Sequence, residues 1–235
     1  MKILKHLVNI IYPSLCLSCN KSLSVEEALF CEGCLRKLPL IKAYCKRCGS
    51  TLNETLVSYF SPDELTYCGF CVKKPPYYDK VFLGFNYEDP IKDLILKAKF
   101  QENYVLAYQL GRLLRRVLNL SLGDYDYCLS IPLSQKRAQE RGYNQSLLLL
   151  WGFSGLKFPY PIIRRIKHTK PQFELTPKER LENVKGAFEV KGKLDNKRIL
   201  LVDDVLTTGA TVNEASKMLK KAGAKIVHLL ILARA

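Results

Sequence analysis

Eight of the nine cysteines form four Cys-x-x-Cys pairs in the first third of the chain, and their spacing predicts metal binding. In such a turn both thiolates can face one Zn²⁺ ion at about 2.3 Å, and two turns complete a tetrahedron. Four thiolates leave no open position for water, so we expect two structural zinc ions. Sequential pairing is simpler, but the spacing also allows pairs one and three to cross-brace with pairs two and four. The pairs are Cys16/Cys19, Cys31/Cys34, Cys45/Cys48 and Cys68/Cys71.

A second candidate site lies at Asp203 and Asp204, where the apolar run 199–202 ends. Carboxylates at the end of a parallel strand stand where open α/β sheets bind ligands, and an adjacent pair suits the hydroxyls of a ribose. The next residues are small and lead directly into a helix. Their backbone N–H groups, the threonine hydroxyls and the helix N-terminus could surround a phosphate. We therefore predict a ribose-phosphate site made by Asp203, Asp204, Thr207, Thr208, Gly209, Ala210 and Thr211.

The composition excludes several classes of protein. With 235 residues and 48% hydrophobic residues the chain can bury a full core, which excludes a disordered or collagen-like protein. It has no apolar run of about 18 residues, so we expect no transmembrane helix. The apolar part of residues 2–13 is short and interrupted, and no small-residue cleavage site follows, so we expect no signal peptide. We expect a cytoplasmic protein, in which cysteine pairs with this spacing bind metal rather than form disulfides.

The charge indicates a polyanionic partner. The chain has 37 basic and 22 acidic residues, a formal charge of +15. Residues 1–80 carry 11 basic and 7 acidic residues, and residues 81–235 carry 26 and 15. The first segment has a formal charge of +4, and eight thiolates with two Zn²⁺ ions would change it by −4, which makes the segment close to neutral. The excess positive charge therefore belongs to the larger segment, which we expect to attract nucleic acid or phosphate-bearing ligands.

The elements that must position these residues alternate between strands and helices after a proline-containing joint at 73–79. Strands are predicted at 81–87, 126–132, 162–166, 186–190, 197–204 and 226–232. Helices are predicted from 90 to 98, from 104 to 118, and from the glycine-containing turn after Asp204 to about 222. Residues 136–151 are predicted to be largely helical. This order implies an α/β domain with a mostly parallel sheet covered on both faces. We place a zinc-binding module at 1–76, with 38–41 as one of its strands, and the α/β domain at 77–235.

The segment 202–211 resembles the phosphoribosyl-pyrophosphate (PRPP) motif of type I phosphoribosyltransferases. Together with the cysteine pairs and the run Pro132-Leu133-Ser134-x-x-Arg137-x-x-x-Arg141-Gly142-Tyr143-Asn144-Gln145, it is similar to the ComF family of competence proteins. Further matches are Leu96-x-x-Lys99-Phe100 and the segments 169–172 and 180–188, so the resemblance covers nearly the whole chain. One departure is that the usual Cys-Pro-x-Cys knuckle reads Cys16-Leu17-Ser18-Cys19.

This resemblance implies a double zinc ribbon before a type I phosphoribosyltransferase-like domain. It also implies a bacterial cytoplasmic protein of natural transformation that acts on incoming single-stranded DNA, at or near the inner-membrane machinery of DNA uptake. A phosphoribosyl transfer reaction does not follow from the motif alone. If the site is active, Asp203 and Asp204 would hold the ribose hydroxyls or Mg²⁺ bound with PRPP.

Several polar residues are candidates for contacts with phosphate or DNA. Arginine side chains bind phosphate through two hydrogen bonds at once, and Arg137 and Arg141 follow a segment placed like the pyrophosphate loop of the resembled fold. A polar loop between two predicted strands is comparable to the hood over phosphoribosyltransferase sites. The alternative for each is a solvated surface. The candidates are Lys99, Arg137, Arg141, Asn144, Gln172, Arg180 and Asn183.

Two functions therefore compete. The chain is either a nucleic-acid-binding competence protein that keeps a phosphate site, or a working phosphoribosyltransferase of nucleotide metabolism. The zinc module and the charge favour the first, whereas the intact acidic pair and threonine-rich loop favour the second. A third hypothesis is an adaptor whose zinc module docks on a helicase or DNA-translocation partner.

Overall fold

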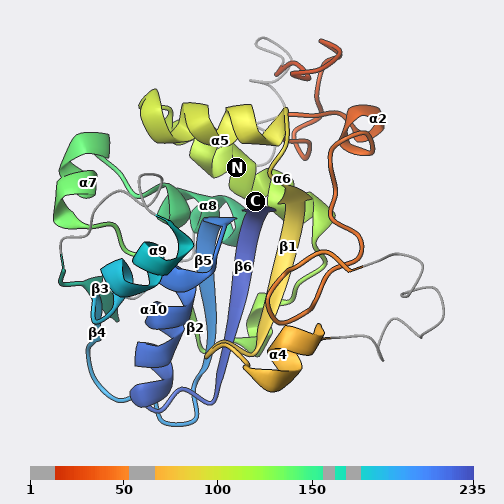
Figure 1. Ribbon diagram of the computed structural model, residues 1–235. Helices are drawn as coiled ribbons and strands as arrows, with labels where there is room; N and C mark the ends of the chain where they lie inside the picture. Colours follow the sequence, from red (N-terminus) through yellow and green to blue (C-terminus); the bar gives the residue numbers. More distant parts are fainter. Residues whose placement is uncertain (1–13, 53–66, 156–161, 168–175) are drawn as a thin grey trace.

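Four parallel strands form the central sheet of the computed structural model, in the order β1-β6-β5-β2 (Figure 1). The structure describes residues 14–52, 67–155, 162–167 and 176–235. β5 and β6 lie in the middle of the sheet and are apolar along most of their length, as expected for strands that are covered on both faces. The predicted parallel sheet is confirmed. Its strands are β1 (Lys80–Asn86), β2 (Tyr127–Ser130), β5 (Arg198–Leu206) and β6 (Ile226–Arg234).

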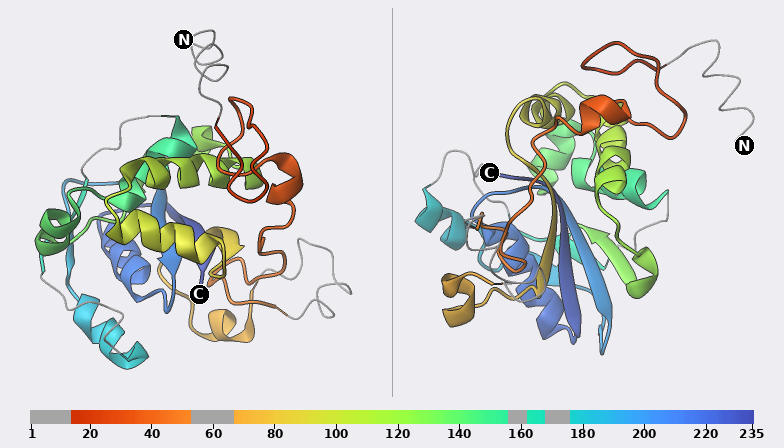
Figure 2. Two further views of the ribbon diagram at one scale, coloured as in Figure 1. Left: turned by 90° about the horizontal axis from the view of Figure 1, so that it is seen from above. Right: turned by 90° about the vertical axis from the view of Figure 1, so that its right-hand side faces the viewer.

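Helices pack on both faces of this sheet (Figure 2, right). One face is covered by three helices, which share a core with Leu200, Val202 and Leu230. The other face is covered by α10 (Ala210–Lys221), whose Val212, Ala215 and Leu219 are buried against it. No helix in the described part of the chain is long and apolar enough to cross a membrane. The three helices are α5 (Ile91–Phe100), α6 (Tyr104–Val117) and α8 (Gln145–Ser154), and the short helix η1 (Leu122–Asp124) leads into β2.

The segment 136–151, predicted to be largely helical, is helical in the structure and is divided into two helices. α7 (Gln135–Arg141) ends at Gly142, whose φ of 69° is in the left-handed region. α8 then begins after Asn144, whose side-chain oxygen accepts hydrogen bonds from the backbone N–H groups of Ser146 and Leu147. The break turns α7 away from the sheet while α8 packs on it.

A small antiparallel pair of strands lies outside the central sheet. β3 (Ile163–Arg165) pairs with β4 (Phe188–Val190), and between them lies α9 (Pro177–Val184). The segment predicted as a polar loop therefore contains a helix. Thr176 and Glu179 form a capping box with proline at the first helical position, which is a helix signal present in the sequence itself.

Residues 39–46 of the cysteine-containing segment pack along the edge of the sheet that β1 forms. The segment includes the short helices α2 (Glu32–Leu35) and α4 (Gly69–Lys73). The predicted ribbon strand at 38–41 does not form, since Leu40 makes a single antiparallel bridge with Phe85 of β1. Asn86 N–H donates to the carbonyl of Pro39 and Val81 N–H to that of Lys46. The segment thus covers an edge strand that would otherwise present unpaired backbone groups. The domain boundary after residue 76 remains a proposal.

Candidate functional site

A cavity of about 720 Å³ opens at the carboxyl ends of β5 and β2. Ligands of open α/β sheets bind at this end of the strands. The charged residues of its wall come mainly from α5, α7, β3 and β5, which the chain order separates widely. They are Lys99, Glu102, Arg137, Glu140, Arg141, Arg165, Asp203 and Asp204. The wall also includes the apolar or aromatic side chains Tyr87, Leu96, Phe100, Ile131, Pro132, Leu133 and Val205, and the polar residues Gln145, Ser146, Thr207 and Thr211.

The acidic pair lies at the wall of this cavity, and its two members have different surroundings. Asp204 is buried, and its Oδ2 lies 3.0 Å from Nζ of Lys99 on α5. Asp203 is half-buried, and its Oδ1 accepts hydrogen bonds from the Ser146 hydroxyl at 2.9 Å and from the backbone N–H of Asp204 at 3.0 Å. Asp204 is therefore the member of the acidic pair that forms an ion pair with Lys99.

The surroundings of Asp203 raise the pKa of its carboxyl group. Burial and the neighbouring charge of Asp204 raise the pKa of Asp203 well above the ordinary carboxyl range. The Ser146 hydrogen bond and the charge of Lys99 act in the opposite direction and are too weak to cancel the effect. Asp203 therefore holds a proton more tightly than an ordinary carboxyl group does.

The predicted phosphate loop connects β5 to α10 at the same end of the sheet. Gly209, with a φ of 76°, occupies the N-cap position of α10 and offers no side chain to cap the helix. The Thr208 hydroxyl accepts a hydrogen bond from the N–H of Ala210 at 3.4 Å. Thr207 and Thr211 are in the cavity wall, whereas Thr208, Gly209 and Ala210 form the turn between them. The N-terminal end of a 12-residue helix thus points to the cavity, as in many anion sites.

Three arginines lie in the cavity wall. Arg137 and Arg141 are on α7, and the Ser134 side chain caps this helix by accepting from the N–H of Arg137. Burial lowers the pKa of Arg141, although the charge of Asp204 opposes this change. Burial and the charge of Arg137 lower the pKa of Arg165 to about 10. These arginines remain cations at neutral pH, and a bound anion would relieve both their desolvation and their mutual repulsion.

Many wall residues were not among the predicted site residues, and two of these, Arg165 and Phe100, have side chains suited to ligand binding. Arg165 is the last residue of β3, and its guanidinium lies 5.4 Å from the ring centre of Phe188. Phe100 is the last residue of α5 and is 65% exposed, with the Arg141 guanidinium 5.4 Å from its ring centre. Such an exposed aromatic ring beside an arginine can stack with a planar ligand. Phe100 belongs to the matched motif Leu96-x-x-Lys99-Phe100, whereas Arg165 carries no local sequence signal, because it reaches the cavity only through the fold.

The other predicted contact residues have different positions. The Asn144 amide donates to the carbonyl of Ile131 at 3.0 Å and its oxygen caps α8, so this side chain holds α8 against the end of β2. Asn183 is half-buried on α9 and is not in the cavity wall as described. Gln172 lies outside the described residues, and so does the side chain of Arg180. Of the predicted contacts with phosphate or DNA, the structure brings together Lys99, Arg137 and Arg141.

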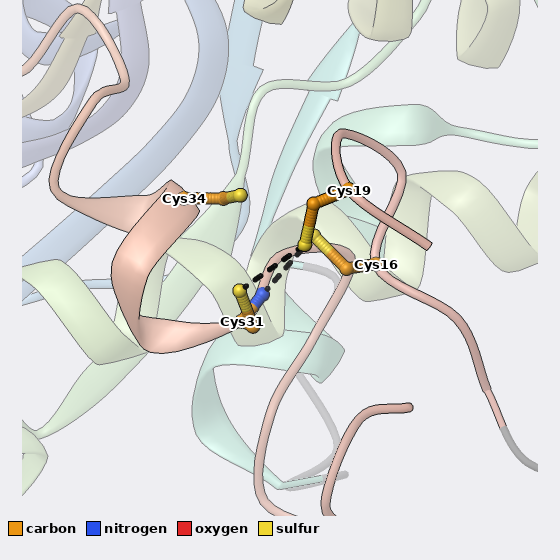
Figure 3. Close-up of side chains that lie close together, drawn as sticks. All are labelled: Cys16, Cys19, Cys31 and Cys34. Carbon is orange, nitrogen blue, oxygen red and sulfur yellow. Dashed lines mark hydrogen bonds between the residues drawn. The ribbon is translucent and has the colours of Figure 1, made fainter. Parts of the chain in front are cut away.

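The cysteines form two clusters, each made by consecutive pairs. The Sγ atoms within each cluster lie within 4.8 Å of one another. The Cys19–Cys31 and Cys48–Cys68 separations are 3.7 Å and 3.6 Å. A tetrahedron with Zn–S bonds of about 2.3 Å has edges of about 3.8 Å, so both clusters fit a zinc ion. Sequential pairing is therefore the arrangement in the structure, with Cys16, Cys19, Cys31 and Cys34 as the first cluster (Figure 3) and Cys45, Cys48, Cys68 and Cys71 as the second.

Backbone donors support thiolates at both clusters. The N–H of Cys31 donates to Sγ of Cys16 at 3.4 Å (Figure 3), and the N–H of Cys68 donates to Sγ of Cys45 at 3.2 Å. Burial would raise the pKa of these two thiols, but the backbone donors lower the pKa of Cys16 to about 6 and that of Cys45 to about 7. The backbone donors therefore favour the thiolate form of one cysteine in each cluster. In the absence of metal, hydrogen bonding with neighbouring thiols and burial raise the pKa of Cys34, and burial raises the pKa of Cys48 and Cys71.

Two models of known protein families match parts of the chain. Residues 149–235 match the phosphoribosyl transferase domain, and residues 7–72 match the double zinc ribbon domain. A crystal structure of purine phosphoribosyltransferase from Pyrococcus horikoshii Ot3 aligns with 58% of this chain and 75% of its own, at 21% identity. Its TM-score is 0.30, too low to support a conclusion. The predicted phosphoribosyltransferase-like domain and zinc ribbons are confirmed by the family matches and the two cysteine clusters.

Curated relatives match nearly the whole chain. Competence protein F of Haemophilus influenzae is 35% identical over 233 residues, which cover 94% of this chain and 96% of that protein. DNA utilization protein YhgH of Escherichia coli (strain K12) is 31% identical over 232 residues, with 94% and 97% covered. Competence protein ComFC of Streptococcus pneumoniae is 32% identical over 150 residues, with 64% and 66% covered.

Proposed function

The chain belongs to the family of competence protein F and DNA utilization protein YhgH, and from this membership we propose that it acts in DNA uptake during natural transformation. In this proposal it binds incoming single-stranded DNA, using a phosphoribosyltransferase scaffold whose phosphate site is retained. The observation that carries the proposal is the shared cavity, which joins the phosphate loop to Lys99, Arg137, Arg141 and an exposed Phe100. Cations beside an aromatic ring are the usual means of holding an unpaired nucleotide.

The loop would hold a ribose 5-phosphate group, either from PRPP or from the end of a DNA strand. The hydroxyls of Thr207 and Thr211 and the first N–H groups of α10 would donate to the phosphate. The carboxylates of Asp203 and Asp204 would accept hydrogen bonds from sugar hydroxyls. Arg137 and Arg141 would neutralise further phosphates, because their guanidinium groups suit bidentate contacts.

If PRPP binds together with Mg²⁺, Asp203 and Asp204 would hold the ribose hydroxyls or this ion, which would stabilise the charge on the pyrophosphate. The two zinc ions would have a structural role, because each cluster supplies four thiolates.

A second candidate function is phosphoribosyl transfer in nucleotide metabolism, favoured by the acidic pair and the intact loop. In that reaction the bond from C1′ to pyrophosphate breaks, an acceptor nitrogen bonds to C1′ and loses its proton, and pyrophosphate leaves. Arg137 and Arg141 would stabilise the charge on the leaving pyrophosphate. No described side chain in the cavity wall identifies a particular acceptor base, which favours the binding function.

One binding panel separates these functions. The full chain is titrated with PRPP and Mg²⁺, with a 5′-phosphorylated single-stranded oligonucleotide, and with the same sequence as a duplex. We expect the single strand to bind more tightly than the duplex, and PRPP to compete with the phosphorylated end. Release of pyrophosphate from PRPP in the presence of a base would instead establish the transferase. Equal binding of single strand and duplex would contradict the proposed DNA function.

Two further parts of the proposal concern location and partners. We propose that the protein acts in the cytoplasm, at or near the DNA-uptake machinery of the inner membrane. The zinc ribbons could also dock on a helicase or translocation protein. Pull-down from competent cells with the wild-type chain and with the zinc ribbons unfolded by chelation tests this adaptor function.

A further inference from the structure

The second cysteine cluster lies against the phosphate loop rather than at a distance from it. Gly49 directly follows the ligand Cys48. A Cβ atom built on Gly49 would lie 2.9 Å from Cδ1 of Leu83 and 3.2 Å from Cδ2 of Leu206. Leu206 is the last residue of β5, and the loop begins at the next residue. The backbone of this zinc knuckle therefore packs directly on Leu206, the residue that precedes the loop.

A tyrosine makes the second contact. Tyr78 is only 4% exposed, and a Cβ atom built on Gly209 would lie 3.4 Å from its hydroxyl oxygen. Burial is the main cause that raises the pKa of Tyr78, and the charges of Cys48 and Cys71 add to it. The buried Tyr78, seven residues after the ligand Cys71, thus places its hydroxyl beside the glycine at the centre of the loop.

Hydrogen bonds make the third contact, between the segment after α4 and the start of α10. The N–H of Tyr77 donates to Oδ1 of Asn213 at 2.8 Å, and the N–H of Asn213 donates to the carbonyl of Gly209 at 2.9 Å. Near the other end of α10, the Asp79 carboxylate accepts from the N–H of Val227 and lies 2.7 Å from Nζ of Lys220. Residues 77–79 thus join the last cysteine pair to the helix that follows the loop.

The first cysteine cluster is attached to a different element. Arg112 of α6 donates to the carbonyl of Val25 at 2.6 Å. Arg116 of α6 donates to the carbonyl of Phe30 at 2.5 Å and lies 3.1 Å from the Glu32 carboxylate. These contacts hold the first cluster on α6, which packs on the face of the sheet opposite α10. The two clusters therefore provide a comparison within one molecule.

We propose that the second cysteine cluster, when it holds zinc, positions the phosphate loop, with Tyr78 and Asn213 as positioning residues. The inference rests on the proposed binding of a ribose phosphate at the loop and goes beyond a purely local structural role for the zinc. A loop that is already ordered loses less entropy when it binds its ligand. Zinc at the second cluster and phosphate at the loop therefore favour each other's binding, and thermodynamic linkage makes this effect reciprocal. The first cluster lacks this coupling.

The test compares Asn213→Ala with the control Arg116→Ala in the full chain. Both variants leave all eight cysteines in place, so zinc analysis should return the wild-type content for each. Hydrogen exchange of the backbone amides of residues 207–213 reports on the loop without any ligand. We expect faster exchange in Asn213→Ala and wild-type exchange in Arg116→Ala. Calorimetry with PRPP should show affinity lowered about 3- to 10-fold in Asn213→Ala, the effect of removing one hydrogen bond, and unchanged in Arg116→Ala.

A second pair of variants tests the zinc ion itself. Cys68→Ser and Cys31→Ser remove equivalent ligands, since each cysteine directly precedes a short helix. Cys68→Ser should speed exchange at 207–213 and Cys31→Ser should not. In the wild type, saturating PRPP should slow the release of zinc to a chelator from the second cluster only. Tyr78→Phe keeps the ring and removes only the hydroxyl, so we expect it to speed exchange at 207–213 by a smaller amount.

The outcomes separate this inference from the proposed function. Loop exchange that is equal in Asn213→Ala and Arg116→Ala, or equal in the two cysteine variants, overturns the coupling even if PRPP binds. Loop exchange that responds to the second cluster alone, in a wild-type chain that does not bind PRPP, overturns the proposed ligand and retains the coupling.

Discussion

Gly209 has the backbone conformation on which the phosphate loop depends. Its φ of 76° is in the region that side chains disfavour, and Tyr78 and Leu206 lie close to where a Cβ atom would be. We expect Gly209→Val to destabilise the fold by about 1–3 kcal/mol and to reduce PRPP affinity strongly. Thr208→Ala is the matched control, because it removes only the hydroxyl that accepts from Ala210. Calorimetry and thermal unfolding measure both effects, and wild-type affinity in Gly209→Val would show that the loop is not the site.

Asp203 gives the site a dependence on pH. Its pKa is raised in the folded chain by burial and by Asp204, so the folded state binds this proton more tightly than the unfolded state. The contribution of Asp203 to stability is therefore largest at low pH and is lost as pH rises above the ordinary carboxyl pKa of about 4 and through the raised value. We expect Asp203→Asn to have a higher free energy of unfolding than the wild type at pH 8, with a difference that shrinks towards pH 4.

Denaturant titrations over this pH range provide the measurement. Asp204→Asn is the control, because it should destabilise the chain by leaving Lys99 without its partner. A difference between Asp203→Asn and the wild type that does not change with pH would contradict the raised pKa.

The zinc knuckles are the elements with the least apolar core of their own. The first cluster contains one helix of four residues and the second contains one of five, and the other described structure consists of isolated β-bridges. Elements this short cannot be stable alone. We expect two zinc ions per chain, each contributing on the order of 10 kcal/mol to the folding of its knuckle. Elemental analysis of the native protein together with a thiol count checks this number. One ion or none, with all thiols reduced, would show that the clusters are not both zinc sites.

The surplus positive charge is spread over many residues of the larger segment, 81–235, and does not belong to a single residue. Binding of single-stranded DNA to this surface should release counterions, so affinity should fall by roughly a decade between 50 and 200 mM salt if about three phosphates are bound. We expect Arg137→Ala with Arg141→Ala to weaken binding and to reduce the salt slope by about 0.7 for each phosphate that is no longer neutralised. Asp203→Asn should not weaken it. Anisotropy titrations at several salt concentrations measure this slope.

Lys73→Ala with Lys74→Ala is the matched control, since it removes the same charge from exposed positions beside the second cluster. An equal loss of affinity in this control would assign DNA binding to the zinc ribbons or to net charge alone. Substitution is a better test than removal of residues 1–80. Residues 39–46 cover the edge of β1, and a shortened chain would expose that strand.

The sequence by itself predicted the features whose signals are local. Cysteine pairs with fixed spacing identify their metal, and the run from Asp203 to Thr211 contains a strand end, a turn and a helix start within a few residues. The parallel sheet followed from the alternation of strands and helices. The capping box at Thr176 and the Gly142–Asn144 helix break are equally local signals, and the predicted elements nevertheless omit both.

The tertiary structure alone decided which distant residues meet. Phe100, Arg141 and Arg165 lie on three different elements, and only the packing of those elements places them around one cavity. The ion pair between Lys99 and Asp204 joins α5 to β5, and Tyr78 approaches Gly209 from before the first strand of the sheet. Side-chain patterns report which face of an element is buried, but they do not report which other element covers it. For this reason the zinc ligands, the loop and the cations Lys99, Arg137 and Arg141 were predictable from the sequence. The place of Arg165, the ion pair between Lys99 and Asp204, and the support of the loop by the second zinc knuckle were not.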